Sequence, residues 1–230
     1  MKTIGLIGGM SWESTVVYYQ LLNQLTREQC GGLHSAQLLL WSFDFAEIEK
    51  LQAKNDWDTA TQKMIDAAQR LENGGAQCIV ICTNTMHKMA KSVQAAVDIP
   101  LIHIADATAD AIKATTTTKP LLLATRYTME QDFYKGYLHE QHGIEVAIPD
   151  EAQRDLVHQI IYEELCQGII REESRKKYQD IVQRAVDKGT DAVIFGCTEV
   201  GLLLKDDDVP VTTFDTTELH ARAALHFALN

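Results

Sequence analysis

The sequence lacks the features that mark membrane-spanning, secreted and disordered proteins. No stretch reaches roughly 18 consecutive apolar residues, which argues against a transmembrane helix. The short apolar run at residues 4–9 is not followed by an Ala-x-Ala site, so we expect no secretory leader and a cytoplasmic location. Hydrophobic residues make up 46% of the chain and charged residues 23%, and these proportions are typical of a globular protein.

Basic residues are also fewer than acidic residues. The chain has 21 basic and 32 acidic residues, which gives a formal net charge of −11. A surface of this sign repels phosphate backbones and anionic lipids, so we expect neither a nucleic acid nor a membrane as a partner. A local cationic pocket for a small molecule is still compatible with this balance.

Cysteine pairs and phosphate-binding motifs are missing too. No Cys-x-x-Cys pair and no Cys/His set with zinc spacing occurs, so we expect free thiols and no metal. Gly8-Gly9-Met10-Ser11 has neither the lysine of a P-loop nor the Gly-x-Gly-x-x-Gly pattern, and no lysine stands out as a Schiff-base candidate for pyridoxal phosphate. We therefore expect no cofactor. The five cysteines are Cys30, Cys78, Cys82, Cys166 and Cys197.

Short apolar runs alternate with longer amphipathic stretches along the whole chain. This alternation predicts an α/β protein with parallel sheets and helical crossovers. The expected strands are residues 3–7, 37–41, 78–81, 101–104, 121–124, 144–148, 192–195 and 209–214. The expected helices are residues 14–27, 56–72, 84–97, 129–142, 153–166, 173–187 and 217–229.

The two halves of the chain show a weak internal similarity. Each has an apolar strand that ends in a small polar cluster, Cys82-Thr83-Asn84-Thr85 in the first half and Gly196-Cys197-Thr198-Glu199 in the second. Ligands of open α/β sheets bind at the carboxyl ends of strands, so we expect two α/β lobes that present these clusters to a shared ligand. An accidental similarity is the alternative, because any βα protein resembles itself.

Cys197 carries the clearest chemical signal. It follows Gly196 at a strand end and precedes Thr198-Glu199, where a helix could begin. A thiol at a helix N-terminus has its thiolate stabilised by unpaired amides and the helix dipole, so we expect a reactive cysteine. The alternative is a buried, inert thiol, the usual state of a free cysteine.

Other polar residues near strand ends have a structural alternative. Thr83-Asn84-Thr85 either binds a ligand or caps the next helix, and Ser11 has the same two interpretations. Arg126 either pairs with a substrate carboxylate or lies at the surface. His87, one helical turn after Thr83, either orients a neighbouring acid or is structural.

Three motifs make the sequence resemble the aspartate/glutamate racemase family over essentially its whole length. They are Gly-Leu-Ile-Gly-Gly-Met-Ser-Trp-Glu-Ser from Gly5, Ile-Cys-Thr-Asn-Thr-Met-His from Ile81 and Ile-Phe-Gly-Cys-Thr-Glu-Val from Ile194. The resemblance implies two pseudo-symmetric lobes, each a parallel sheet flanked by helices, with the active site in the cleft between them, and a homodimer. The implied lobes are residues 1–100 with 211–230, and residues 101–210.

The resemblance also implies racemisation of an amino acid, with aspartate and glutamate the first substrates to try, and no cofactor. In the family, one cysteine from each lobe faces the substrate Cα. One thiolate removes the α-proton, and the other thiol delivers a proton to the opposite face. In this chain the second-lobe role falls on Cys197, which serves the L-enantiomer by analogy with glutamate racemases.

One position departs from the family pattern. The first motif usually reads Cys-Asn-Thr, whereas this chain has Thr83-Asn84-Thr85 with a cysteine displaced to Cys82. Successive strand side chains point to opposite faces, so we expect Thr83 to face the site and Cys82 to face away. Thr83 then takes the first catalytic role. Its hydroxyl is a very weak acid and needs a relay, such as water or His87.

The substrate-binding residues also come from the resemblance. Members specific for acidic substrates use cations near the positions of Leu51-Gln52 and Cys166-Gln167-Gly168. This chain has no cation there, which keeps Arg126 as a candidate partner of a side-chain carboxylate. The implied substrate-binding residues are Met10, Ser11, Gln52, Asn84, Thr85, Thr125 and Thr198.

Two other functions are compatible with this sequence. If Thr83 cannot replace the missing cysteine, the chain is a catalytically silent amino-acid-binding protein. If only Cys197 acts, it is a one-cysteine decarboxylase or cis–trans isomerase of the same superfamily. Exchange of the α-hydrogen in deuterium oxide separates these functions, because a pure binder gives none.

Overall fold

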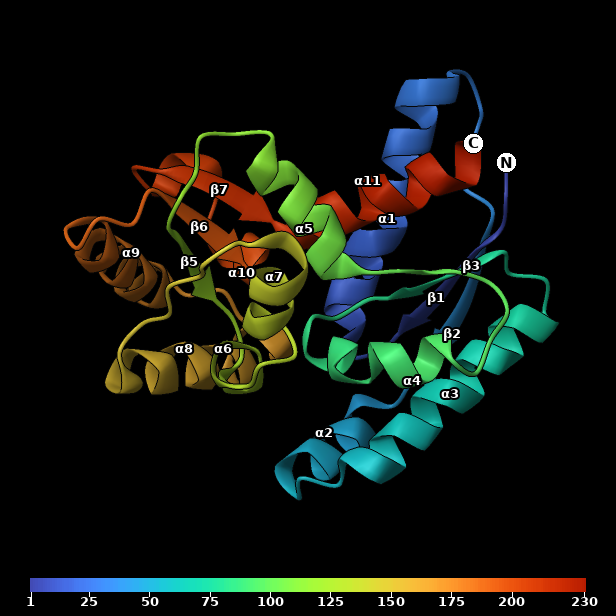
Figure 1. Cartoon of the computed structure of the whole chain (residues 1–230), viewed down its shortest axis with the longest axis horizontal. Coiled ribbons are helices and arrows are strands. Elements are labelled where there is room, and N and C mark those ends of the chain that lie inside the picture. The colour runs from blue at the N-terminus through green and yellow to red at the C-terminus, as the bar shows by residue number, and fades with distance from the viewer. The chain divides into compact units, whose positions relative to one another are not determined.

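The computed structural model describes all 230 residues and divides the chain into two compact α/β units (Figure 1). The first unit consists of Met1–His103 and His220–Asn230, and the second of Ile104–Leu219. The prediction of an α/β fold with parallel sheets flanked by helices is confirmed in each unit. None of the helices combines the length and the hydropathy needed to cross a membrane.

A four-stranded parallel sheet forms the centre of the first unit. Its order is β2-β1-β3-β4, and its register aligns Ile7 of β1 with Trp41 of β2 and with Ile81 of β3. Every residue of β3 is apolar and buried, as expected of a central strand covered on both faces. The strands are β1 (Ile4–Gly8), β2 (Leu38–Ser42), β3 (Cys78–Ile81) and β4 (Leu101–Ile102).

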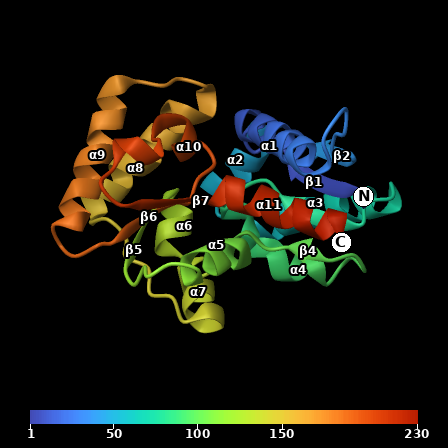
Figure 2. The same ribbon diagram turned by 90° about the horizontal axis from the view of Figure 1, so that it is seen from above.

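Two hydrophobic clusters lie on the opposite faces of this sheet. Ile79 and Ile81 pack with α3 and α4, whereas Cys78 and Val80 pack with α1 and α11. Figure 2 shows α1 and α4 well separated in this unit. The helical elements are α1 (Trp12–Cys30), α2 (Phe45–Ala53), α3 (Trp57–Asn73), the 3₁₀ helix η1 (Thr85–Met89), α4 (Ala90–Gln94) and α11 (Thr216–Leu229), which starts in the second unit.

A three-stranded parallel sheet forms the centre of the second unit, in the order β5-β6-β7. Helices α8 and α9 lie on one side of it and α5 and α7 on the other (Figure 2). The strands are β5 (Pro120–Leu123), β6 (Ala192–Phe195) and β7 (Thr212–Asp215). The helical elements are α5 (Ile104–Lys113), α6 (Arg126–Glu130), α7 (Lys135–His142), α8 (Glu151–Glu163), η2 (Leu165–Gln167), α9 (Glu172–Val186), α10 (Val200–Leu203) and η3 (Asp206–Asp208).

The two sheets share a connection pattern. In the first, the chain passes from β1 to β2 on one side and then crosses to β3 on the other. In the second, it passes from β5 to Ala147, which forms a parallel bridge with Leu121, and then crosses to β6. A crevice forms at the carboxyl ends of strands whose connections diverge. The fold therefore favours ligand positions at the ends of β1 and β3 and at the ends of β5 and β6.

Several expected elements differ in extent. The helix expected over 84–97 is η1 followed by the short α4, because Met89 leaves helical geometry between them (φ −99°, ψ 3°). The helix expected over 129–142 is α6 and α7, because Gln131 is extended. Residues 144–148 form the Ala147 bridge rather than a strand. The sequence patterns do not predict α2 or α5.

The second sheet reaches further along the chain than the sequence boundary at residue 210. β7 pairs with β6 through the register Phe195↔Asp215, so the chain stays in the second unit until Leu219. The family resemblance had implied that residues 211–230 belong to the first lobe, whereas only His220–Asn230 belong to the first unit. The physical reason for the difference is that backbone pairing with β6 holds residues 212–215, whereas only the later turns of α11 pack on the first sheet.

Candidate active site

The segment after β1 approaches its neighbours closely. Gly9 has a φ of +80°, and a side chain there would collide with the backbone of Phe43, so only glycine fits. Met10 and Ser11 follow, with 5% and 1% of their surfaces exposed. Ser11 is the N-cap of α1, and its hydroxyl accepts a hydrogen bond from the Ser14 N–H. The capping interpretation of Ser11 is confirmed, and its contact with substrate stays a prediction.

The segment after β3 joins that strand to η1. Thr83 is partly exposed, whereas Asn84 and Thr85 are buried. Asn84 precedes η1, but its side chain makes no capping hydrogen bond. The capping interpretation of Asn84 is therefore wrong, and its role in ligand binding stays a prediction.

Cys82 and Thr83 lie in different environments. Cys82 is 1% exposed and belongs to the apolar cluster with α1 and α11. Burial raises the pKa of its thiol far above the usual value, so it stays protonated. The carbonyl of Thr83, by contrast, accepts a hydrogen bond from Nδ1 of His87 at 2.8 Å. Because successive side chains of an extended chain point to opposite faces, Cys82 lies in the core.

Gln52 reaches the same part of the first unit from α2. It is buried, and its Nε2 donates to Sδ of Met86 at 3.3 Å. Met86 directly follows Thr85, so the structure brings Gln52 beside the segment after β3. Its amide is neutral, and it supplies no cation for a side-chain carboxylate.

Cys197, Thr198 and Glu199 form a hydrogen-bonded cluster after β6. The Cys197 thiol donates to Oε2 of Glu199 at 2.9 Å, and the Thr198 hydroxyl donates to the same oxygen at 2.7 Å. The Cys166 thiol lies 3.8 Å from the other carboxylate oxygen. Sequence reasoning missed this role of Glu199. The signal available was an acid two residues after a cysteine at a strand end.

The surroundings raise the pKa of Cys197 well above that of an exposed thiol. Burial is the largest cause, and the neighbouring Glu199 carboxylate is the next. The expected lowering by a helix N-terminus is wrong, because α10 is a single turn that starts only at Val200. Cys197 is therefore a neutral thiol at pH 7, with its proton directed at Glu199. Burial likewise raises the pKa values of Tyr162 and Tyr178, with the nearby acidic groups adding to the shift.

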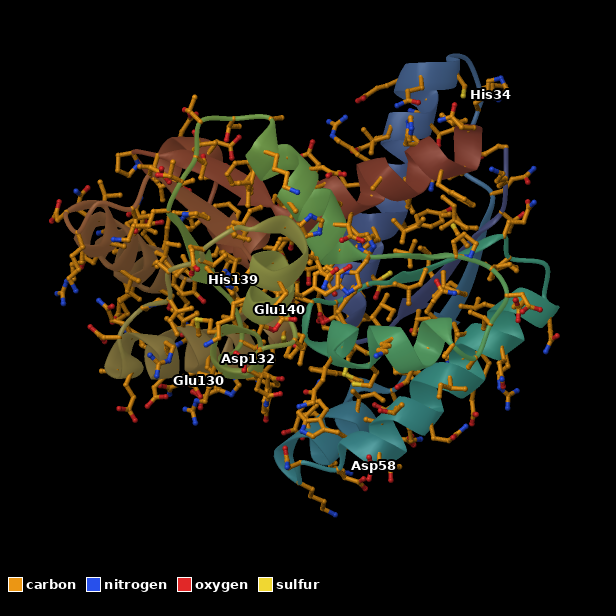
Figure 3. The ribbon with its side chains drawn as sticks, in the orientation of Figure 1. His34, Asp58, Glu130, Asp132, His139 and Glu140 are labelled. Carbon is orange, nitrogen blue, oxygen red and sulfur yellow. The ribbon has the colours of Figure 1, made fainter.

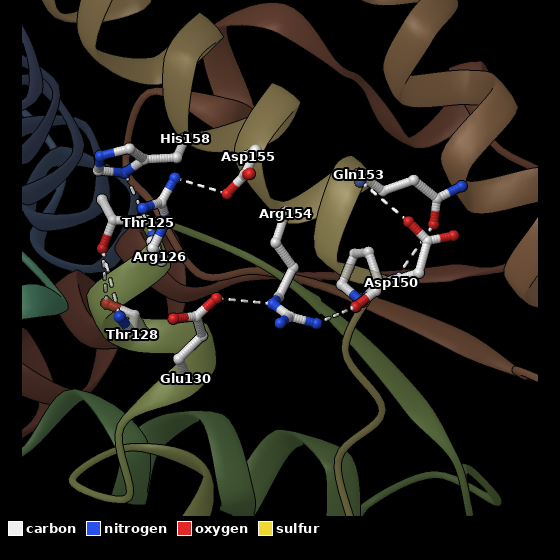
Figure 4. Close-up of polar contacts among 10 residues, drawn as sticks. Thr125, Arg126, Thr128, Glu130, Asp150, Gln153, Arg154, Asp155 and His158 are labelled. Atoms are coloured by element: carbon white, nitrogen blue, oxygen red, sulfur yellow. Dashed lines mark hydrogen bonds and ion pairs between the residues drawn. The ribbon is translucent and has the colours of Figure 1, made fainter.

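Thr125 and Arg126 follow β5 and have structural partners. Thr125 caps α6 by accepting a hydrogen bond from the Thr128 N–H at 3.3 Å. Figure 4 shows the Arg126 guanidinium directed at Asp155 of α8, with which it forms an ion pair at 2.5 Å. The Arg126 backbone N–H donates to Nδ1 of His158 at 3.2 Å. This pairing favours the surface interpretation of Arg126 over a role in binding a substrate carboxylate.

Many of the remaining charged side chains lie on the outer surface. Asp58, Glu130, Asp132, His139 and Glu140 are exposed (Figure 3). No group of three or more His, Cys, Asp or Glu side chains is arranged to hold a metal. The polar groups that sequence reasoning singled out are instead concentrated at the strand ends.

The predicted site residues gather at the carboxyl end of the sheet in their own unit. All of them except Gln52 follow neighbouring parallel strands that are in register, so they share one edge of the sheet. Gln52 reaches the first edge from α2. A site shared between the two units stays a prediction from the resemblance. The first edge has Met10, Ser11, Gln52, Thr83, Asn84 and Thr85, and the second has Thr125, Cys197 and Thr198.

Comparison with known proteins finds relatives over the whole chain. A family model described as Asp/Glu/hydantoin racemase matches residues 7–224. The structure is similar to a candidate Asp/Glu racemase from Yersinia pestis, at 55% identity, full coverage of both chains and a TM-score of 0.92. It is also similar to an aspartate racemase homologue from Pyrococcus horikoshii OT3, at 35% identity, full coverage of both chains and a TM-score of 0.86. The broad specificity amino-acid racemase RacX of Bacillus subtilis (strain 168) is 25% identical over 170 residues, which are 74% of this chain and 73% of RacX.

Proposed function

The chain belongs to the Asp/Glu/hydantoin racemase family, and from this premise we propose that it inverts the α-carbon of aspartate or glutamate without a cofactor, using Cys197 and Thr83. It is an amino-acid racemase, an isomerase. The observation that carries the residue assignment is the contact between the Cys197 thiol and Glu199, which places a proton acceptor beside the thiol after β6. Thr83 takes the matching place after β3.

Cys197 removes the α-proton of the L-substrate. The Cα–H bond breaks, its electron pair stays on Cα and the adjoining carboxylate, and the proton goes to Sγ. The resting thiol must first lose its own proton, and Oε2 of Glu199, 2.9 Å away, is the acceptor in place. The α-ammonium group of the substrate adds positive charge, which favours the thiolate over the neutral thiol.

Thr83 returns a proton to the opposite face. The new Cα–H bond takes the hydroxyl proton, and the threonine oxygen recovers a proton from water. A hydroxyl is a far weaker acid than a thiol, so this transfer is the slow step. The carbanion then often recovers a proton from Cys197 and returns to the L-enantiomer.

Polar groups at the two edges stabilise the charge that develops on the substrate. Hydroxyl and amide dipoles fixed before the reaction cost no reorganisation when the carbanion forms. Asn84 and Thr85 supply them after β3, and Thr125 and Thr198 after β5 and β6. Met10, Ser11 and Gln52 complete the substrate contacts.

The test is incubation of each enantiomer of aspartate and glutamate in deuterium oxide. Exchange of the α-hydrogen is followed by NMR and inversion by chiral chromatography. We expect the L-substrate to exchange faster than it inverts, with no added cofactor. Binding without exchange would support the silent binding protein instead, and release of carbon dioxide would support the decarboxylase.

We also propose that the racemase is a cytoplasmic homodimer. The resemblance to the family supports the dimer, and the five free thiols are typical of a reducing compartment. Light scattering after size-exclusion chromatography measures the mass directly. A mass of one chain across micromolar concentrations would contradict the dimer.

A further inference from the structure

A histidine holds the backbone that carries the Thr83 hydroxyl. β3 ends at Ile81 and η1 begins at Thr85, so Thr83 lies between two regular elements. Its carbonyl accepts a hydrogen bond from Nδ1 of His87 at 2.8 Å. The bond goes to the backbone of Thr83 and thereby restrains the peptide from which its side chain projects.

Hydrogen-bond acceptors fix the tautomers of two histidines in this region. A carbonyl oxygen only accepts, so Nδ1 of His87 carries the proton. The same reasoning places the proton of His220 on Nε2, which lies 2.7 Å from the Ile102 carbonyl oxygen. Nδ1 of His220 then accepts from the Tyr18 hydroxyl at 2.8 Å.

Ring contacts hold His87 in place from several sides. Its ring meets His103 edge-on, with centroids 4.8 Å apart, and His220 in the same manner at 5.5 Å. Tyr18 from α1 packs against His220 of α11. His87 is 3% exposed, and both His220 and Tyr18 are fully buried. Burial and the neighbouring imidazoles lower the pKa of His87, so the ring stays neutral and its orientation depends on packing.

We propose that His87 is a positioning residue for Thr83, whose carbonyl it holds so that the hydroxyl is presented for proton transfer to the face opposite Cys197. The inference rests on the proposed function. The proposed role requires a hydrogen-bond donor at the position of Nδ1. A side chain of similar volume without a donor would not fulfil it. A shift of the hydroxyl by about 1 Å is enough to cost roughly 10²-fold in rate.

Three substitutions of His87 separate this role from packing. In His87→Asn the amide nitrogen takes the place of Nδ1, in His87→Gln the donor lies one bond farther out, and His87→Leu has no donor. Each variant is incubated with L-aspartate in deuterium oxide, and exchange, inversion, kcat and KM are measured. We expect inversion to fall by about 10- to 100-fold in the Gln and Leu variants, with exchange through Cys197 and KM close to wild type. The Asn variant should recover most of the inversion.

An unchanged ratio of inversion to exchange in the Gln and Leu variants would overturn the proposal. Equal inversion in the Asn and Gln variants would also overturn it, as would a parallel loss of exchange and inversion. If His87→Leu does not fold, the Asn and Gln pair still decides the question. Thr83→Ala is measured beside them: normal inversion there would refute the role of Thr83 itself, whatever the His87 variants do.

Discussion

The ends of β3 and β6 occupy matching places in two similar sheets, yet they hold different chemical groups. β3 is followed by a partly exposed threonine whose carbonyl is bound by a neutral imidazole. β6 is followed by a buried thiol whose proton is directed at a carboxylate. The strand connection therefore sets where a proton-transfer group lies, whereas the neighbouring side chains set its acidity.

Removing the thiol after β6 should have the largest effect. We expect Cys197→Ser to lower kcat by about 10²- to 10⁴-fold, because a serine hydroxyl is a far weaker acid than the thiol that it replaces. Exchange and inversion should both fall, while binding of aspartate measured by calorimetry should be kept. Near-normal turnover would contradict the assignment of Cys197.

Removing the carboxylate tests what distinguishes the β6 end. Glu199→Gln takes away the charge that raises the pKa of Cys197, so that pKa should move to lower pH. It also removes the proton acceptor, so kcat should fall by about 10²-fold. The rate of Cys197 alkylation against pH, read by mass spectrometry, gives the first quantity. A shift of that profile to higher pH would show that Glu199 acts in another way.

A cysteine at position 83 would give both strand ends a thiol. We expect Thr83→Cys to raise inversion relative to exchange by about tenfold or more, because a thiol is a much better acid than a hydroxyl. Thr83→Ser, which keeps a hydroxyl, is the matched control and should not raise it.

Thermodynamics limits how this change can appear. The enantiomers have equal free energy in water, so kcat/KM must be the same in both directions. A preference for one enantiomer therefore shows only in kcat and KM taken separately, or in exchange without inversion. If the wild type already exchanges and inverts L-aspartate equally, and Thr83→Cys changes nothing, Thr83 is not the limiting acid.

Lowering the pH should destabilise the fold through the buried imidazoles near the end of β3. Burial lowers the pKa of His220 to about 4 and that of His87 well below its usual 6.5. Between pH 6.5 and 4 the unfolded chain binds protons that the folded chain does not, so stability falls as the pH falls and is unaffected above this window. The lowered pKa of His220 alone corresponds to a loss of roughly 3 kcal/mol in the free energy of unfolding across this window.

Urea denaturation at several pH values measures this effect. We expect His220→Gln to flatten the pH dependence, whereas His34→Gln, at an exposed position, should leave it unchanged. Stability that rises between pH 6.5 and 4.5 in the wild type would contradict the sign.

The smallest effect is expected at the displaced cysteine. Cys82→Ala should cost about 1 kcal/mol of stability, because it leaves a small cavity in the cluster with α1 and α11, and activity should stay near wild type. Thermal denaturation and turnover measure the two quantities. Rapid, substrate-protected alkylation of Cys82 would instead place this thiol in the active site.

Local patterns were sufficient for much of the fold and for the positions of the key residues. The strand expected over 192–195 has those bounds in the structure, because it is a buried apolar run with turn residues on both sides. The period of two along a strand separated Cys82 from Thr83, and Cys82 does lie in the core. The extents of α4, α6 and α7 were less predictable, because single residues such as Met89 and Gln131 leave helical geometry.

The amino-acid sequence alone specifies the alternating α/β plan, the two polar strand ends and the family. Hydrophobic periodicity and motif spacing are local properties that the chain carries before it folds. The acidity of the groups at those strand ends, and the side chains around them, depend on tertiary contacts. Burial beside Glu199 and Cys166 raises the pKa of Cys197, and the packing of α1 and α11 brings Tyr18 and His220 behind His87. Apart from the pair Cys197–Glu199, these contacts join residues far apart in the chain, and electrostatics depends on distance and burial in space, which no local pattern specifies.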